Sequence, residues 1–276
     1  MRIDIVSLFP EFFDAFFSHS IIKRAIEAER LSMGVTSPRD FSHNKHGQVD
    51  DTPYGGGAGM LMMAPPIFEA VESVIAQYDS HINSAYSVDE MCDEMSLIGN
   101  PIESIRRRVI FMGPTGQPFT QEKARELATY DQLVLICGHY EGVDYRVEEH
   151  LVDETISIGD YVLTGGELPA MVVADAVARM IPGVLGAASG AQEDSFYEPL
   201  LECPQYTKPP EFRGWGVPDV LRSGHHKNIA TWRQKEALKR TRLLRPDLLE
   251  RPLTKEEVKL LKEIIAEESE RDKGEV

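Results

Sequence analysis

The sequence predicts an α/β protein with a small helical region at its C-terminal end. Apolar, strand-like runs alternate with amphipathic stretches through residues 1–180, a pattern that favours a mainly parallel sheet. Glycine-rich turns at residues 112–116, 137–142 and 157–169 each follow such a run. From residue 196 onward, Pro-rich turns give way to helical patterns. Because glycine lets the backbone approach a ligand closely, we expect the three turns to line one pocket.

Hydrophobic periodicity and helix start and stop signals predict the individual strands and helices. Strands are expected at residues 2–9, 32–36, 108–112, 133–137 and 154–157. Helices are expected at residues 10–29, 65–78, 117–129 (Thr120 as N-cap), 144–150 and 169–180 (Pro169 at its start). C-terminal helices are expected at residues 219–221, 227–241, 246–249 and 254–271, the last opened by a capping box of Thr254 and Glu257.

Three segments lack a regular pattern. Residues 38–59 are rich in polar and turn residues and predict a long, functional loop. Residues 79–105 are acidic and irregular, and we interpret them as a surface insertion. Residues 181–195 are small and polar and predict a linker. The expected domains are therefore 1–180 and 196–276, joined by this linker.

Composition limits the class of protein. The 276 residues are 42% hydrophobic, enough for one or two globular domains with a sizeable core. No apolar run approaches the roughly 18 residues that span a bilayer, and residues 1–10 look like a strand rather than a secretory signal. Cys92, Cys137 and Cys203 form no CxxC pair, which predicts free thiols in a cytoplasmic protein and argues against zinc.

Charge is unevenly distributed along the chain. The net charge of −16 by itself argues against a nucleic-acid partner, because phosphates repel an acidic surface. Residues 222–245, however, carry eight lysines and arginines, with Glu236 as the one carboxylate. A basic RNA-binding face and an ordinary solvated helix face explain this segment equally well.

Seven motifs in order carry a resemblance to a known family. They are Ser37–Asp40, Asp50–Met60, Gly138–Gly142, Ser157–Pro169, Glu193–Phe196, Cys203–Thr207 and Ser223–His226. The set resembles the bacterial tRNA (guanine-N1)-methyltransferases over nearly the whole chain apart from residues 79–105. Members usually lack that segment, and Glu202 stands where an aspartate is expected.

The resemblance implies a fold and an activity that periodicity does not reveal. It implies a SPOUT-type parallel-sheet domain tied in a trefoil knot, followed by the small helical domain, in a homodimer whose active site is shared between subunits. It implies methyl transfer from S-adenosylmethionine to N1 of the tRNA guanine immediately 3′ of the anticodon, position 37. The family also uses Mg²⁺, whose ligands spacing does not identify. The resemblance implies tRNA as the partner and no association with a membrane.

Two residues are the catalytic candidates. The resemblance implies that Asp194 is the general base that removes the N1 proton, and the neighbouring Glu193 would raise its pKa. The structural alternative is a helix N-cap at a domain start. Arg179 is the candidate hydrogen-bond donor to guanine O6, where negative charge builds. Its alternative is an exposed arginine favoured by a helix C-terminus.

The donor pocket and the RNA surface follow from the same resemblance. The donor candidates are Pro114, Gly138, Glu141, Ile158, Gly159, Asp160, Tyr161, Val162, Leu163, Gly165, Gly166 and Pro169. Glu141 has two open roles, the donor's ammonium or a guanine edge, and each glycine taken alone suits an ordinary turn. The RNA candidates are Lys23, Arg24, Arg39, His43, Lys45, His46, Asp50, Tyr54, Ser223, His226 and Arg233.

The sequence also bears on four other functions. Residues 55–59 are glycine-rich but lack the Lys-Ser/Thr of a phosphate-binding P-loop, which excludes nucleotide hydrolysis. A dinucleotide-binding oxidoreductase would carry G-x-G-x-x-G after the first strand, and this chain does not. A related knotted methyltransferase acting on another RNA is the main alternative. A non-catalytic RNA-binding protein, which would lack donor affinity, is a further one.

Overall fold

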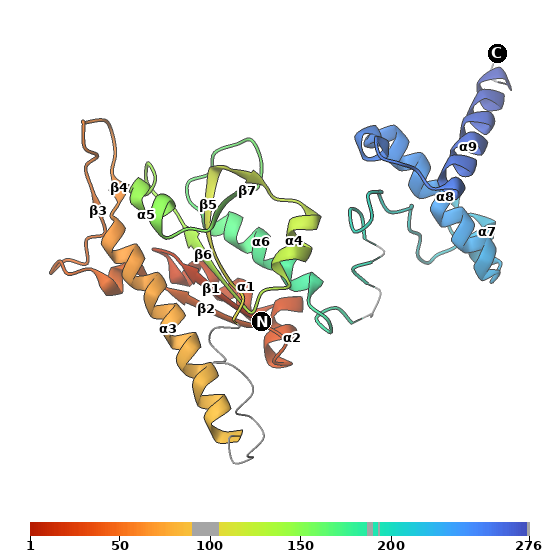
Figure 1. Cartoon of the computed structure of the whole chain (residues 1–276). Helices are drawn as coiled ribbons and strands as arrows, with labels where there is room; N and C mark the ends of the chain where they lie inside the picture. The colour runs from red at the N-terminus through yellow and green to blue at the C-terminus, as the bar shows by residue number, and fades with distance from the viewer. Residues whose placement is uncertain (90–104, 187–189, 193, 275–276) are drawn as a thin grey trace. The chain divides into compact units, whose positions relative to one another are not determined.

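A five-stranded parallel sheet forms the centre of the N-terminal part in the computed structural model, which describes residues 1–89, 105–186, 190–192 and 194–274 (Figure 1). The strand order is β2-β1-β6-β5-β7. The strands are β1 (Arg2–Val6), β2 (Ser32–Thr36), β5 (Arg107–Pro118), β6 (Gln132–Cys137) and β7 (Glu154–Ser157). The predicted parallel sheet is therefore confirmed.

Helices and turns connect the strands and cover both faces of the sheet (Figure 1). They are η1 (Pro10–Phe13), α1 (Asp14–Ser18), α2 (Ser20–Glu27), η2 (Pro38–Phe41), α3 (Ala64–Asp89), α4 (Gln121–Leu127), α5 (Tyr145–His150) and α6 (Glu167–Met180). A short antiparallel pair, β3 (Asp50–Asp51) and β4 (Leu61–Met62), lies in the loop before α3.

Side-chain alternation along the strands divides the core into two layers. In β6, Leu133 and Leu135 pack with α2, α4 and α6 on one face. Val134 and Ile136 pack with α3 and α5 on the other. Because both faces are covered, the strands are apolar on both sides, as is typical of parallel sheets. The site therefore rests on a rigid, doubly covered sheet.

Three predicted elements differ from those observed. The single helix expected over residues 10–29 is broken into η1, α1 and α2, because His19 is extended and Ser20 has φ 56°. The helix expected over residues 65–78 continues to Asp89. The prediction that residues 79–105 are irregular is therefore wrong for residues 79–89, and residues 90–104 lie outside the described residues. The loop expected over 38–59 contains η2 and β3.

The turn expected at residues 112–116 lies inside strand β5. The pairing of β5 with β7 shifts between Met112 and Gln117, so these residues form an irregularity rather than the end of a strand. Gly116 is required there, because an added Cβ would lie 2.4 Å from the carbonyl oxygen of Thr155. The helix that follows starts at Gln121, later than expected, with Thr120 confirmed as its N-cap.

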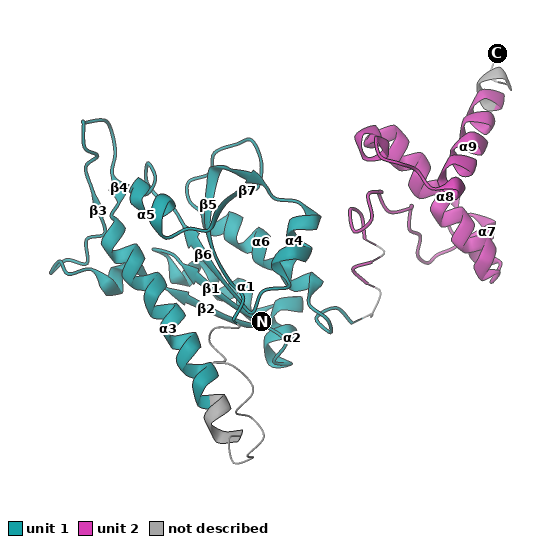
Figure 2. Cartoon of the chain, in the orientation of Figure 1, with its two compact units in different colours: residues 1–188 teal, residues 189–276 magenta. Residues whose placement is uncertain are grey.

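The chain divides into two compact units, residues 1–188 and 189–276 (Figure 2). The second unit contains β8 (Glu211–Phe212), β9 (Trp215–Gly216), α7 (Asp219–Arg222), α8 (His226–Leu244), η5 (Pro246–Leu249) and α9 (Lys255–Gly274). Its buried core consists of Leu238, Leu260 and Ile264. The predicted C-terminal helices are confirmed, and the sequence did not predict the β8–β9 hairpin. None of the helices in the described residues is long and apolar enough to cross a membrane.

The capping box predicted for the last helix is present. The backbone N–H of Glu257 donates to Thr254 Oγ1 at 3.2 Å, and the N–H of Thr254 donates to Glu257 Oε2 at 2.7 Å. Arg251 also donates to Glu257 Oε1 at 2.6 Å, and this hydrogen bond is the largest cause that lowers the Glu257 pKa from 4.5 to about 2. The carboxylate of Glu257 is therefore ionised and held at the start of α9.

Candidate functional site

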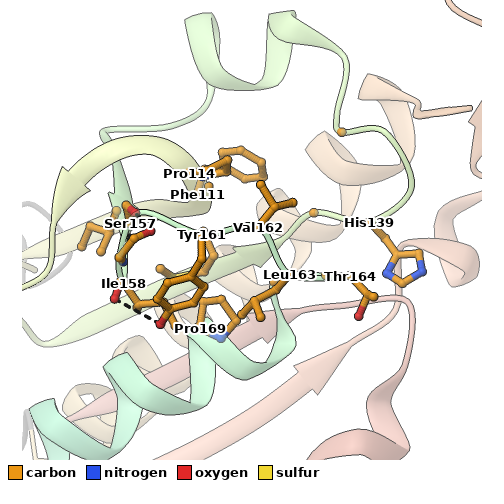
Figure 3. A pocket seen from close by; sticks show the side chains of 18 of the residues that line it. Phe111, Pro114, His139, Ser157, Ile158, Tyr161, Val162, Leu163, Thr164 and Pro169 are labelled. Atoms are coloured by element: carbon orange, nitrogen blue, oxygen red, sulfur yellow. Dashed lines mark hydrogen bonds between the residues drawn. The ribbon is translucent and has the colours of Figure 1, made fainter. Parts of the chain in front are cut away.

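A cavity lies where β5 bulges and where β6 and β7 end, with the first turns of α6 beside it (Figure 3). Three loops supply its walls, the β5 bulge and the segments after β6 and β7. They are the three glycine-rich turns of the sequence. The fold brings them together because β5 lies between β6 and β7 in the parallel sheet, so the ends of β6 and β7 lie on either side of the β5 bulge.

Most of the predicted donor residues line this cavity. They are Pro114, Gly138, Glu141, Ile158, Gly159, Tyr161, Val162, Leu163, Gly165, Gly166 and Pro169. Asp160 is exposed and is not among the lining residues, so its donor role stays a prediction. Lining residues that the sequence argument did not select are Phe111, Met112, Gly113, His139, Tyr140, Gly142, Ile156, Ser157 and Thr164.

The loop after β7 is held by its own short hydrogen bonds. Ser157 Oγ donates to the carbonyl of Gly159 at 3.1 Å and accepts from the N–H of Gly159 at 3.2 Å. The Tyr161 hydroxyl donates to the carbonyl of Ile158 at 3.3 Å, which folds the ring back over the loop (Figure 3). Val162 and Leu163 follow as exposed apolar side chains. The loop thus offers backbone polar groups and an apolar wall to a ligand.

Gly166, at the start of α6, connects the loop after β7 to the loop after β6. Its N–H donates to the carbonyl of Gly138 at 2.8 Å. A Cβ at this position would lie 2.7 Å from Cα of Cys137 and 2.9 Å from the N of Gly138. Backbone atoms cannot move aside as a flexible side chain can, so only glycine permits this approach.

A buried polar group lies next to the cavity, and the sequence argument missed it. Glu167 is 5% exposed, and its Oε1 accepts a hydrogen bond from Ser7 Oγ at 2.8 Å. His139 Nδ1 is also buried and makes no hydrogen bond within the described residues. Its ring packs edge-on against Phe9, with centroids 4.9 Å apart. A glutamate or aspartate in the first turn of a helix is normally exposed and stabilised by the helix dipole. In the sequence Glu167 looks like any such residue, so no local signal predicts its burial.

Neither described cysteine is a nucleophile candidate. Burial, with Glu167 as the second cause, raises the pKa of Cys137 well above its usual value. Partial burial also raises the pKa of Cys203, although Arg233 opposes this. A thiol reacts as its thiolate, so both shifts lower the reactivity of these cysteines. Cys92 lies outside the described residues.

The glycine-rich loop of residues 50–62 is attached to the cavity's rim. The N–H of Glu141 donates to the carbonyl of Met60 at 3.1 Å, and the N–H of Met62 donates to the carbonyl of Gly142 at 2.9 Å. A Cβ on Gly59 would collide with the Glu141 side chain, 2.3 Å from its Cγ. The fully exposed Tyr54 and the half-buried Asp50 belong to this loop. They therefore lie on the segment that is hydrogen-bonded to Glu141 and Gly142.

The RNA candidates of the first unit do not form one patch. Lys23 and Arg24 lie on α2, which packs on one face of the sheet, and Lys23 contacts Glu27 at 3.6 Å. Arg39 and His43 lie at and after η2, which packs against α3 on the other face. His43 Nε2 lies 2.8 Å from Glu69 Oε1. Lys45 and His46 follow in the same exposed segment.

The two catalytic candidates lie in different units of the chain. Arg179 is half-buried in the last turn of α6. Asp194 is half-buried and lines a second cavity together with Glu202, Trp232 and Arg233. The alternative role of Asp194 as a helix N-cap is wrong, because the next helix in the described chain is α7, which begins at Asp219. Glu193 lies outside the described residues.

The remaining RNA candidates lie in the second unit. Ser223 follows α7, and His226 begins α8. Arg233 lies on α8 and lines the second cavity beside Trp232. Among the described residues, no group of three or more histidines, cysteines or carboxylates is arranged to hold a metal ion. Within residues 1–89, 105–186, 190–192 and 194–274, the donor set therefore does not fit a dedicated Mg²⁺ site.

Known proteins resemble this chain over nearly its whole length. The family profile described as tRNA (Guanine-1)-methyltransferase TrmD matches residues 1–251. A protein of Desulforamulus reducens is 54% identical over 265 residues, 96% of this chain and 95% of its own length. A protein of Dehalococcoides mccartyi strain CBDB1 is 50% identical, and the match covers 98% of this chain and 99% of the relative. A protein of Brevibacillus brevis is 53% identical, and the match covers 96% of this chain and 98% of the relative. Each of the three is named tRNA (guanine-N(1)-)-methyltransferase.

Proposed function

Because this chain belongs to the tRNA (guanine-1)-methyltransferase family, we propose that it methylates N1 of the guanine immediately 3′ of the anticodon, position 37, in tRNA. The observation that carries the proposal is the agreement of two results. The relatives match almost the whole chain, and the three glycine-rich turns line one cavity at the edge of the sheet. The alternative of a related enzyme for another RNA has no comparable support.

The cavity suits S-adenosylmethionine as methyl donor. When bound, this cofactor supplies an electrophilic methyl group on a positively charged sulfur. Ile158, Leu163 and Pro169 would contact its apolar parts, and the backbone N–H and C=O groups of the loops would bind its adenine edge. The close approach of Gly166 to residues 137–138 keeps these loops in register. The residues present therefore fit the donor.

Methylation at N1 requires that a proton leave the guanine. That N–H is weakly acidic at neutral pH, so a base must accept the proton as the methyl group arrives. We assign this role to Asp194. Its segment forms no helix, so the carboxylate is not used as a helix N-cap. Arg179 is assigned to O6, because a guanidinium is always charged and its N–H groups stabilise the negative charge that builds there.

This arrangement also explains the choice of base. Adenine has no proton on N1 and carries an amino group where guanine has O6. Bound in the same place, adenine would offer no proton to the Asp194 carboxylate and would turn an amino group, rather than an acceptor oxygen, toward the Arg179 guanidinium. A site built to hydrogen-bond one edge of a base discriminates strongly against an analogue with a mismatched edge.

We infer the wider organisation from the family and from the division into units. Residues 1–180 would form the methyltransferase domain with its SPOUT-type trefoil knot, 181–195 the linker and 196–276 the tRNA-binding domain. The boundary between the two compact units falls within the proposed linker, which supports this division. The proposed active form is a cytoplasmic homodimer with a shared active site. The Mg²⁺ that the family resemblance implies has no assigned ligands among the described residues.

Replacing the proposed base tests the mechanism. Asp194→Asn keeps the side chain's size but cannot accept the proton, so turnover should fall roughly 100- to 10,000-fold. Methyl transfer from labelled S-adenosylmethionine to a tRNA transcript measures this rate, and digestion of the product should release 1-methylguanosine.

The matched control is Asp219→Asn, a fully exposed aspartate in the same unit. Both variants should bind S-adenosylmethionine with wild-type affinity by calorimetry. An Asp194→Asn enzyme with near-normal turnover would remove Asp194 from the reaction.

A further inference from the structure

The β8–β9 hairpin presents two aromatic side chains to solvent. We call residues 211–216 the aromatic hairpin. Its strands join through a two-residue turn in which Arg213 has φ 55° and Gly214 has φ 83°, the left-handed pair that tight hairpins use. Phe212 is 57% exposed and Trp215 is 70% exposed. Their ring centroids are 6.4 Å apart. The turn therefore fixes both exposed rings side by side on one short hairpin.

The two rings contribute little to the core of their own unit. Among the described residues, the core of the second unit is built from Leu238, Leu260 and Ile264, with Leu200, Leu249 and Leu261 packed against it. Neither ring of the aromatic hairpin belongs to this set, and residues 205–216 are exposed throughout. Large aromatic side chains left in water on a hairpin form a surface suited to binding.

The charge around the hairpin indicates which partner it binds. Residues 205–245 carry ten lysines and arginines against three carboxylates, whereas the whole chain has a net charge of −16. The Arg213 guanidinium lies over the Phe212 ring, 5.1 Å from its centroid. An aromatic ring and a guanidinium plane are the groups on which unpaired RNA bases stack, and the surrounding positive charge attracts the phosphates.

We propose that the aromatic hairpin is a stacking platform for an unpaired base of the substrate RNA, separate from the base that is methylated. This inference rests on the proposed function, because it takes a tRNA as the partner. The base must lie in a single-stranded loop or bulge, since paired bases have both faces covered by their neighbours. Every base has a π-face, so the platform contributes affinity rather than a sequence preference.

Affinity for tRNA tests the platform. Trp215→Ala should weaken binding of a tRNA transcript roughly 5- to 150-fold, and Phe212→Ala should weaken it in the same direction. Trp215→Phe, which keeps an aromatic face, should retain most of the affinity. Ile265→Ala is the matched control, because Ile265 is an exposed apolar residue of the same unit on the acidic helix α9. Circular dichroism and S-adenosylmethionine binding should be unchanged in all four variants.

Fluorescence and salt dependence separate stacking from charge. The chain has two tryptophans, so Trp232→Phe leaves Trp215 as the single one, and stacking of a base should quench its emission when tRNA is added. Arg213→Ala should lower the salt dependence of binding by about one phosphate contact, whereas Trp215→Ala should leave that slope unchanged.

Wild-type tRNA affinity in Trp215→Ala, with no quenching of Trp215, would overturn the inference. Dissociation of the wild-type dimer to monomers in Trp215→Ala, measured by sedimentation, would overturn it too, because the hairpin would then be a contact between copies of this chain. The proposed function fails separately. If the wild-type enzyme methylates no tRNA while RNA still quenches Trp215, the platform stands and the assigned reaction is wrong.

Discussion

Gly166 shows how one residue connects the sequence to the site. The sequence marks it as part of a glycine-rich turn, and the structure adds the physical reason. The backbone of Cys137 and Gly138 occupies the space that a Cβ would need. The residue has φ −82°, so its role is to allow a close approach rather than to provide a left-handed conformation.

Gly166→Ala should therefore separate the two loops of the cavity. We expect a loss of about 1–3 kcal/mol in the free energy of unfolding, as for other overpacked sites, with a larger loss of S-adenosylmethionine affinity. Thermal unfolding and calorimetry measure the two effects. Gly186→Ala is the control, because nothing lies within 4 Å of its added Cβ. Equal donor affinity in both variants would contradict this explanation of the cavity.

At the same scale, the sequence predicts glycines better than buried charges. Gly138, Gly159, Gly165 and Gly166 are recognisable because glycine-rich turns recur directly after successive apolar runs. Glu167 is not recognisable, since its partner Ser7 lies 160 positions away and only the folded chain brings the two together. Long-range pairs of this kind leave no local pattern.

At the scale of elements, helix ends were predictable where a side chain caps them. Thr120 and the pair Thr254 and Glu257 act locally, so the residues beside a helix determine where it starts. The C-terminal extension of α3 to Asp89 has no such signal, because a polar stretch can continue a helix in solvent. The β5 bulge depends on the partner strand β7 and was likewise not visible in the sequence.

The capping box of α9 predicts a pH dependence of stability. The pKa of Glu257 is lowered from 4.5 to about 2, so its ionised form stabilises the folded state above pH 4.5, and this contribution is lost as the pH falls toward 2. Glu257→Gln should therefore cost about 1–3 kcal/mol of unfolding free energy at pH 7. The difference between the variant and the wild type should shrink as the pH falls through that window.

Urea unfolding followed by tryptophan fluorescence measures this difference. Both tryptophans, Trp215 and Trp232, belong to the second unit, so the signal reports that unit alone. Glu256→Gln is the control, because Glu256 is exposed in the same first turn. A penalty for Glu257→Gln that is as large at pH 2.5 as at pH 7 would show that the carboxylate's charge is not the cause.

At the scale of the whole molecule, the two units divide the proposed chemistry. Arg179 belongs to residues 1–188 and Asp194 to residues 189–276. A homodimer allows the Arg179 of one subunit to act with the Asp194 of the other, whereas a site within one chain needs both from the same copy. The proposed knot and dimer rest on the family resemblance, because neither helix nor strand periodicity carries information about threading or association.

Mixing two inactive variants distinguishes these arrangements. Arg179→Ala and Asp194→Asn should each be inactive alone. If the site is shared, mixed dimers hold one intact site, and random reassociation should restore about a quarter of the wild-type rate. If each chain builds its own site, the mixture stays inactive. The measurement is methyl transfer after the variants have been unfolded and refolded together, with the separately refolded variants as controls.

The most direct test of the central claim compares two tRNA transcripts that differ only in the base immediately 3′ of the anticodon. We predict that labelled methyl groups pass from S-adenosylmethionine to the guanine transcript and not to the adenine transcript. Equal labelling of both would contradict the assigned target. Labelling of neither, by an enzyme that binds the donor, would contradict the assigned substrate.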